Sequence, residues 1–184
     1  IGADPSLFSL FLRIPSVHDV RTILNVQAHE YDYYVSAISC VELFSIIDPC
    51  KDLMFPYITP KADEVTTLKS EVDAHAEGKL KIGIHWQGNL TFNNRDMKSI
   101  PATEMLAFEE YGQLFSLQYD AGTNVLPLTS SVINLAEGEP SWDRTAAAIN
   151  SMDAIITNDG SIAHMAGAMN KQTIVLSPLV ASIY

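Results

Sequence analysis

The stretch ITNDGSIAHMAGAM, residues 156–169, decides the fold class. An apolar strand pattern ends there in a short polar turn, and the turn leads into a helix of small residues. A junction of this kind points the backbone N–H groups of the first helical turn, with the positive end of the helix dipole, at whatever lies above the sheet. Phosphate is the usual ligand of such a position, which Asp159 and His164 flank. We therefore expect the functional site here.

Strand and helix patterns alternate on both sides of this junction. Apolar runs predict strands at Leu80–Trp86, Leu114–Tyr119, Val132–Leu135, Ala154–Thr157 and Thr173–Leu176. Helices are predicted from Lys61 to about Glu77, from Pro101 to Tyr111, from a Ser141 cap to Met152, and from Ser161 to Met169. This alternation predicts an α/β fold, a Rossmann-like doubly wound parallel sheet in which ligands bind at the carboxyl ends of strands.

The first of these helices has a defined apolar face and end. Val65, Leu68, Val72 and His75 are spaced for one face, and Gly78 is the expected C-terminal stop. Before it, residues 1–52 contain only short apolar pieces, for which we expect a short helix followed by two strands. The pieces are Leu7–Ile14, Val20–Val26 and Tyr31–Ser39. We divide the chain accordingly into residues 1–60 and a ligand-binding domain of residues 61–184.

Composition narrows the class of function. The 184 residues carry 11 Lys+Arg against 22 Asp+Glu, a net charge of −11, so a nucleic-acid surface has little support. No apolar run reaches the roughly 20 residues of a membrane span, and no basic signal-peptide start is present, so a cytoplasmic setting is the default. The two cysteines, Cys40 and Cys50, are expected to be buried thiols.

Both ends of the sequence are abrupt. It starts at Ile1 instead of Met, and it stops shortly after the last predicted strand with no closing helix. We expect a chain truncated at both ends, with apolar surface exposed around Leu7–Leu12 and Leu176–Ile183. Such surface predicts self-association into a homo-oligomer.

Two polar loops follow predicted strands. The first, residues 87–101, offers positive charge from Arg95 and Lys98, neutral hydrogen bonds from Asn93 and Asn94, and close backbone approach at Gly88. This is the local basicity that a diphosphate would need in an acidic protein. A solvated loop in which Arg95 pairs with the neighbouring Asp96 is the alternative.

The second loop is residues 158–161. Asp159 or Ser161 could simply cap the following helix, and His164, one turn along, could be a structural histidine. The functional interpretation gains weight because the two loops, of opposite character, are expected at the same edge of one sheet.

The sequence offers no comparable motif for dinucleotide, metal or nucleophilic chemistry. No glycine-rich dinucleotide fingerprint or Walker-type loop is present, which argues against a nicotinamide-dependent enzyme. The five histidines lack metal-ligand spacing and no Asp-x-Asp pair occurs, so metal dependence is disfavoured. No serine or cysteine has the context of a nucleophile.

Several motifs in order resemble the family 9 glycosyltransferases, in particular the heptosyltransferase-like domain found behind tetratricopeptide repeats in bacterial proteins. The matching segments are KIGIHWQGN at 81–89, NRDMKSIP at 94–101, FSLQ at 115–118, TAA at 145–147 and DGSIAHMAGA at 159–168. The segment YDYYVSAIS at 31–39 resembles the one that leaves the amino-terminal domain in those proteins.

The resemblance implies a GT-B fold, of which residues 61–184 would be the carboxyl-terminal half and residues 1–60 a remnant of the amino-terminal domain. It implies a nucleotide-diphospho-sugar donor bound without a metal or other cofactor. By position, Lys98 would contact donor phosphate, Asp159 would bind sugar hydroxyls and His164 would support the donor site. The remaining donor-binding candidates are Gln87, Gly88, Asn89, Asn93, Asn94, Arg95, Gln118, Gly160 and Ser161.

The sequence also departs from the family. Gly160 stands where the family usually has Thr or Ser. The acidic general base of heptosyltransferases belongs to the start of the amino-terminal domain, which is expected to be missing here together with the repeats. Two hypotheses follow: a metal-independent, inverting glycosyltransferase whose saccharide or protein acceptor is unassigned, or a non-catalytic module that binds a nucleotide sugar or a protein partner.

Overall fold

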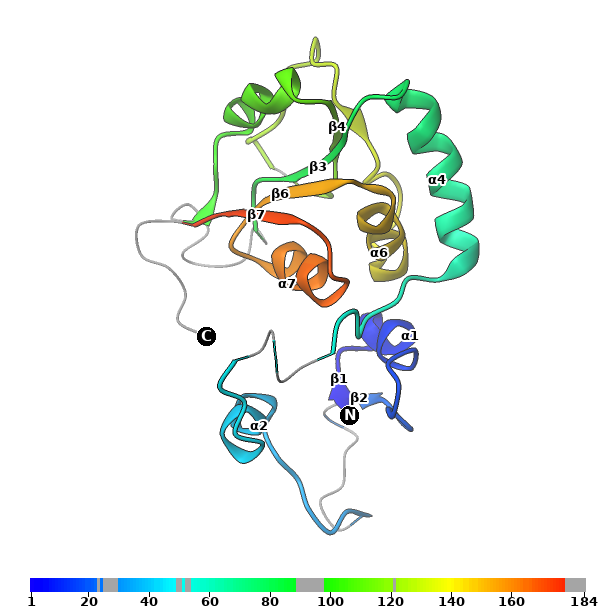
Figure 1. Cartoon of the computed structure of the whole chain (residues 1–184), viewed down its shortest axis with the longest axis vertical. Coiled ribbons are helices and arrows are strands. Elements are labelled where there is room, and N and C mark those ends of the chain that lie inside the picture. Colours follow the sequence, from blue (N-terminus) through cyan, green and yellow to red (C-terminus); the bar gives the residue numbers. More distant parts are fainter. Residues whose placement is uncertain are drawn as a thin grey trace. The chain divides into compact units, whose positions relative to one another are not determined.

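The computed structural model describes residues 1–22, 24, 30–48, 51, 54–88, 98–120 and 122–177 (Figure 1). The chain forms two compact units, Ile1–Thr59 and Pro60–Tyr184, and each is described by itself.

The first unit contains little regular structure. Strands β1 (Gly2–Ala3) and β2 (Arg21–Thr22) pair in parallel, and the chain between them forms the 3₁₀ turn η1 (Pro5–Leu7) and the short helix α1 (Phe8–Phe11). The predicted short helix is therefore confirmed, as is a strand within the Val20–Val26 piece. Residues 31–36 have no regular structure.

The strand predicted at Tyr31–Ser39 is wrong, because helix α2 (Ala37–Leu43) begins inside that range. Tyr33 and Tyr34 are both exposed, so the apolar pattern there does not mark a buried strand. A strand also needs a neighbour to pair with, and within the described part of this unit the only paired strands are β1 and β2.

Helix α4 (Ala62–Ala76) opens the second unit as predicted. It ends because Glu77 and Gly78 adopt positive φ angles of 50° and 82°, which turn the chain out of the helix. Its buried face consists of Leu68, Val72 and Ala76, and it packs against helix α6 (Trp142–Ser151). His75 is exposed, so its predicted place on the apolar face is wrong, and Ala76 occupies that face instead.

The core of the second unit is a five-stranded parallel sheet in the order β5-β4-β3-β6-β7. All five strands were predicted from their apolar runs, with β7 matching at both ends and the others differing by up to three residues at an end. Their bounds are β3 Lys81–His85, β4 Gln113–Ser116, β5 Ile133–Asn134, β6 Ala154–Asn158 and β7 Thr173–Leu176.

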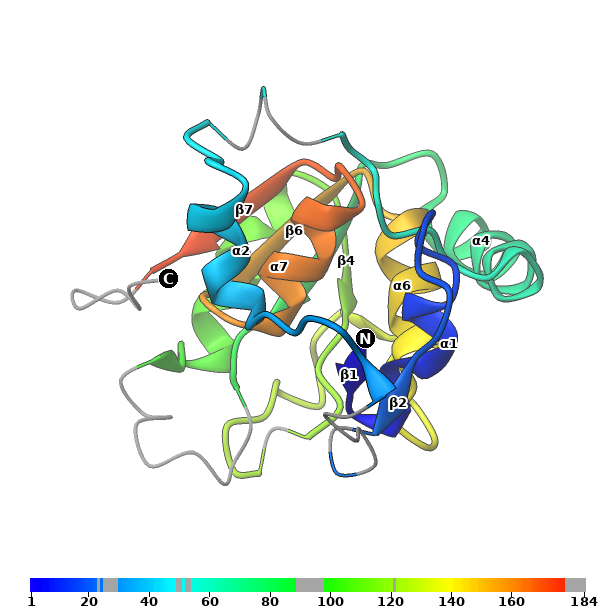
Figure 2. The same cartoon turned by 90° about the horizontal axis from the view of Figure 1, so that it is seen from below.

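Helices cover both faces of this sheet. The 3₁₀ helix η4 (Ala102–Glu110), green in Figure 1, lies on one face, and α6 (Trp142–Ser151) and α7 (Ser161–Ala168) lie on the other. Figure 2, turned by 90°, brings α6 and α7 in front of the strands. The Ser141 side chain caps α6 as predicted, accepting a hydrogen bond from Arg144 N. The Rossmann-like doubly wound fold is thus confirmed.

Strand order determines where a ligand can bind. From β3 the chain runs outward through β4 to β5, then returns to place β6 on the other side of β3. Residue His85 of β3 pairs with Thr157 of β6, so the carboxyl ends of these two strands meet at the reversal of strand order. In open α/β sheets this switch point is where ligands bind.

No helix in the described ranges is long and apolar enough to cross a membrane.

Candidate functional site

The two polar loops predicted to form the site follow β3 and β6, whose carboxyl ends are neighbours at the switch point. The structure places Gln87, Gly88 and Lys98 from the first loop there. The candidates Asn89, Asn93, Asn94 and Arg95 lie outside the described residues, as does Asp96.

Backbone hydrogen bonds hold the two ends of the first loop. Ile100 N donates to Trp86 O at 2.9 Å, which joins the chain after Lys98 to the end of β3. Asn124 secures the same region, because its side chain accepts from Ala102 N and donates to Ile100 O, both at 2.8 Å. Its carbonyl accepts from the buried indole of Trp86, also at 2.8 Å. These hydrogen bonds therefore hold the chain that follows Lys98 beside the switch point.

The helix N-terminus at the site has a glycine cap. Gly160 is the N-cap residue of α7, in extended backbone with φ −167°, and makes no side-chain cap hydrogen bond. The N-cap position therefore belongs to Gly160 and not to Asp159 or Ser161. The backbone N–H groups of a helix's first turn and the positive end of its dipole both suit an anion.

A charged pair lies beside this helix start. Lys98 Nζ is 3.4 Å from Asp159 Oδ2, with side chains 31% and 14% exposed. The main chain of Lys98 is held as well, since Asn158 Nδ2 donates to Lys98 O at 2.9 Å. The structure thus brings Lys98, Asp159 and the α7 N-terminus together, as the sequence predicted.

The remaining predicted residues of α7 face away from the sheet. Ser161 and His164 are exposed, whereas Ile162, Met165 and Ala166 are buried. The spacing of three residues puts Ser161 and His164 on one side of the helix, as expected.

Gln118 supports the end of β3 from the neighbouring strand. Its side-chain oxygen accepts hydrogen bonds from Gln87 N at 2.9 Å and Trp86 N at 3.3 Å, and its amide nitrogen donates to Asp120 O. Gln118 therefore shapes the turn in which Gln87 and Gly88 lie. Among the described residues, no atom lies within 4 Å of the position that a Cβ atom of Gly88 would take.

Sequence reasoning missed a buried polar pair at the switch point. His85 Nδ1 lies 2.9 Å from Asn158 Oδ1. Burial lowers the pKa of His85 to about 4, although the hydrogen bond with Asn158 raises it somewhat. The available signal was a polar residue at the carboxyl end of each of two apolar strands.

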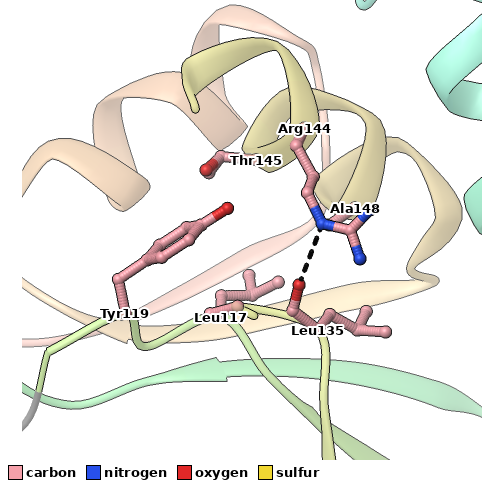
Figure 3. A pocket seen from close by; sticks show the side chains of 7 residues that line it. Leu117, Tyr119, Leu135, Arg144, Thr145 and Ala148 are labelled. Carbon is pink, nitrogen blue, oxygen red and sulfur yellow. Dashed lines mark hydrogen bonds between the residues drawn. The ribbon is translucent and has the colours of Figure 1, made fainter. Parts of the chain in front are cut away.

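A small hollow lies at the carboxyl ends of β4 and β5, which are on the opposite side of β3 from β6. Leu117 and Tyr119 after β4, Leu135 and Ala136 after β5, and α6 line this hollow, which has no room for a water molecule. Figure 3 shows the Tyr119 hydroxyl pointing toward α6, where Arg144 donates to Leu135 O at 3.3 Å. The Tyr119 hydroxyl is buried and has no hydrogen-bond partner among the described residues. The hollow is too small to admit a ligand group beside this hydroxyl.

Within the described ranges, no three His, Cys, Asp or Glu side chains are grouped so that they could hold a metal ion.

Fold and site together define a Rossmann-like α/β domain with a lysine, a carboxylate and a helix N-terminus at its topological switch point. The chain is similar in structure to the E. coli ADP-heptose LPS heptosyltransferase II, with a TM-score of 0.41 and 19% sequence identity. The match covers 68% of this chain and 41% of that one, so the chain spans well under half of that enzyme's length. No protein-family model matches the chain, and no curated protein matches it.

Proposed function

We propose that this chain binds a nucleotide-diphospho-sugar at the switch point and serves as the donor-binding part of a metal-independent, inverting glycosyltransferase. The observation that carries the proposal is the convergence of the Lys98 ammonium group, the Asp159 carboxylate and the N-terminus of α7. The resemblance of the same segments to family 9 glycosyltransferase motifs agrees with it.

Each group has a role that its chemistry supports. Lys98 and the N–H groups at the start of α7 would bind the diphosphate, Lys98 by charge and the helix by hydrogen bonds and its dipole. Asp159 can accept hydrogen bonds from sugar hydroxyls while remaining within reach of Lys98. Lys98 and the N-terminus of α7 would together take the place of the divalent cation that other enzymes use to neutralise a diphosphate.

In the proposed reaction, an acceptor hydroxyl attacks the anomeric carbon as the bond from that carbon to the diphosphate oxygen breaks. The bonding electrons leave with the nucleoside diphosphate, and the acceptor proton passes to a base outside this site. Negative charge grows on the leaving oxygen, where Lys98 and the helix dipole stabilise it more than in the ground state. Attack from the face opposite the leaving group inverts the anomeric configuration.

The test is calorimetric titration of the protein with ADP-, GDP- and UDP-sugars, each with and without EDTA. We expect saturable binding to one of them that survives EDTA and is weakened in Asp159→Ala and Lys98→Ala. Lys69→Ala is the matched control, because Lys69 also pairs with an aspartate, Asp73, but on the exposed surface of α4. No binding to any of the three classes would overturn the proposal.

Transfer is tested separately. Release of free nucleoside diphosphate in the presence of a saccharide acceptor would support the glycosyltransferase, whereas binding with no turnover would favour the non-catalytic binding module.

A further inference from the structure

The His85–Asn158 pair sits directly beneath the candidate site. His85 is 8% exposed and Asn158 is 1% exposed, so both are buried at the end of the sheet. Asn158 immediately precedes Asp159, and its side chain makes two hydrogen bonds of 2.9 Å, one with His85 Nδ1 and one to Lys98 O. A buried polar connection therefore runs from β3 through β6 to the lysine of the first loop.

The connection has a direction. A side-chain amide offers one oxygen that accepts and one nitrogen that donates. Because the nitrogen of Asn158 donates to Lys98 O, its oxygen faces His85 and needs a donor there. The ring of His85 must then carry its proton on Nδ1, and the low pKa of the buried ring is consistent with a neutral imidazole in this tautomer.

His85 in turn fixes the amide of Asn158. If that amide rotated by half a turn, its oxygen would face the carbonyl oxygen of Lys98, and two acceptors would oppose each other. The Nδ1–H group of His85 opposes this rotation because it would lose its acceptor. Thr157 lies next to the pair, with its hydroxyl 3.4 Å from Nδ1 and donating to Asn158 O at 3.1 Å.

Lys98 is thereby attached to the β6–α7 junction twice. Asn158 holds its carbonyl, and the next residue, Asp159, lies 3.4 Å from its ammonium group. We propose that His85 and Asn158 are positioning residues that hold Lys98 against the N-terminus of α7, so that its charge meets an anion bound there. This inference rests on the proposed function for the identity of the anion, a nucleotide diphosphate.

A purely structural role makes a different prediction. Replacing a buried hydrogen-bonded pair by apolar side chains of similar size can leave stability nearly unchanged, because no group is left unsatisfied. If the pair only fills space, such replacement should leave Lys98 and ligand binding as they were. If the pair positions Lys98, both should change even when stability does not.

The experiment uses Asn158→Leu, His85→Leu, their combination and His85→Gln. The glutamine amide can still donate to Asn158 Oδ1, so His85→Gln is the conservative rescue. Acetylation of individual lysines is followed by mass spectrometry, with exposed Lys69 as the reference in the same molecule. Nucleotide-sugar affinity and thermal unfolding are measured in parallel.

We expect Asn158→Leu to speed acetylation of Lys98 relative to Lys69 by about twofold, since the released side chain gains access to the reagent. The starting exposures are 31% for Lys98 and 58% for Lys69. We also expect nucleotide-sugar affinity to fall by about tenfold, the worth of roughly one well-placed hydrogen bond. His85→Leu should act in the same direction and His85→Gln should restore wild-type values.

Unchanged acetylation and affinity in a folded Asn158→Leu protein would overturn the inference. If that variant does not fold, the comparison of His85→Leu with His85→Gln carries the test, and equal behaviour of the two would overturn it. A wild-type protein that binds no nucleotide sugar would sink the proposed function, while the acetylation rates would still decide whether the pair positions Lys98.

Discussion

The ammonium group of Lys98 lies 3.4 Å from the carboxylate of Asp159, across a separation of 61 residues in the chain. The two residues meet because the carboxyl ends of β3 and β6 are neighbours at the switch point. The pair places one positive and one negative side chain beside the N-terminus of α7. An anion bound there would meet Lys98 first, and hydroxyl groups would meet Asp159.

Lys98→Ala is expected to weaken nucleotide-sugar binding by about 10- to 100-fold, the range for a hydrogen bond to a charged group. Arg95→Ala, in the same loop, should have a smaller effect, because the proposed phosphate contact belongs to Lys98. Calorimetric dissociation constants provide the measurement. Equal losses in the two variants would mean that the loop acts as a diffuse positive patch.

Gly160→Ser should be accepted without strain. The extended φ of −167° suits any residue, and a Cβ atom there would lie 3.8 Å from its nearest neighbour, Asn158 Oδ1. Because serine can cap a helix, we expect the free energy of unfolding to rise by a few tenths of a kcal/mol in urea denaturation. Gly112→Ala provides the contrast, since its Cβ would come within 2.3 Å of Leu80 O and should destabilise the protein.

Tyr119→Phe should stabilise the unliganded protein or leave it unchanged. The Tyr119 hydroxyl is buried and has no partner in the part of the chain that the structure describes, and an unsatisfied buried polar group costs about 1–3 kcal/mol. Tyr33→Phe, at an exposed position, should change nothing. A clear loss of stability in Tyr119→Phe alone, measured by urea denaturation, would show that the hydroxyl has a partner after all.

Stability should depend on pH through His85. Its pKa is about 4 in the folded protein against 6.5 ordinarily, so the unfolded chain binds the proton more readily. Stability due to the neutral ring is therefore complete above about pH 6.5 and is lost as the pH falls toward 4, by up to about 3 kcal/mol. Because carboxylates titrate in the same pH range, the effect of His85 is isolated by comparison. The free energy of unfolding of wild type and of His85→Gln is measured by urea denaturation at pH 7 and pH 4.5. An identical pH dependence of the two proteins would contradict the prediction.

The regular elements of the second unit were predictable because each is encoded locally. Continuous apolar runs such as Leu80–Trp86 indicated buried parallel strands, and the 3.6-residue period indicated α4 and α6. Errors arose where local pattern and burial diverge. His75 fits the apolar face by spacing yet lies exposed. Tyr31–Ser39 has strand-forming residues but no neighbouring strand among the described residues of its unit.

The candidate site was predictable in part. That Lys98 and Asp159 would meet followed from the rule that loops after parallel strands share one edge of the sheet. The glycine cap of α7 was missed because Asp159 and Ser161 are the commoner capping residues. The supporting bonds of Gln118 and Asn124 were also missed, because nothing in the local sequence says which distant backbone groups a side-chain amide will reach.

The sequence by itself determined the succession of strands and helices, the acidic charge and the presence of polar loops at strand ends, because propensity and periodicity act over a few residues. Only the tertiary structure decided that β6 returns to the side of β3. That order brings His85 and Asn158, 73 residues apart, within 2.9 Å of each other. Pairing between distant strands sets their register, and register alone determines which side chains at the strand ends can share a hydrogen bond.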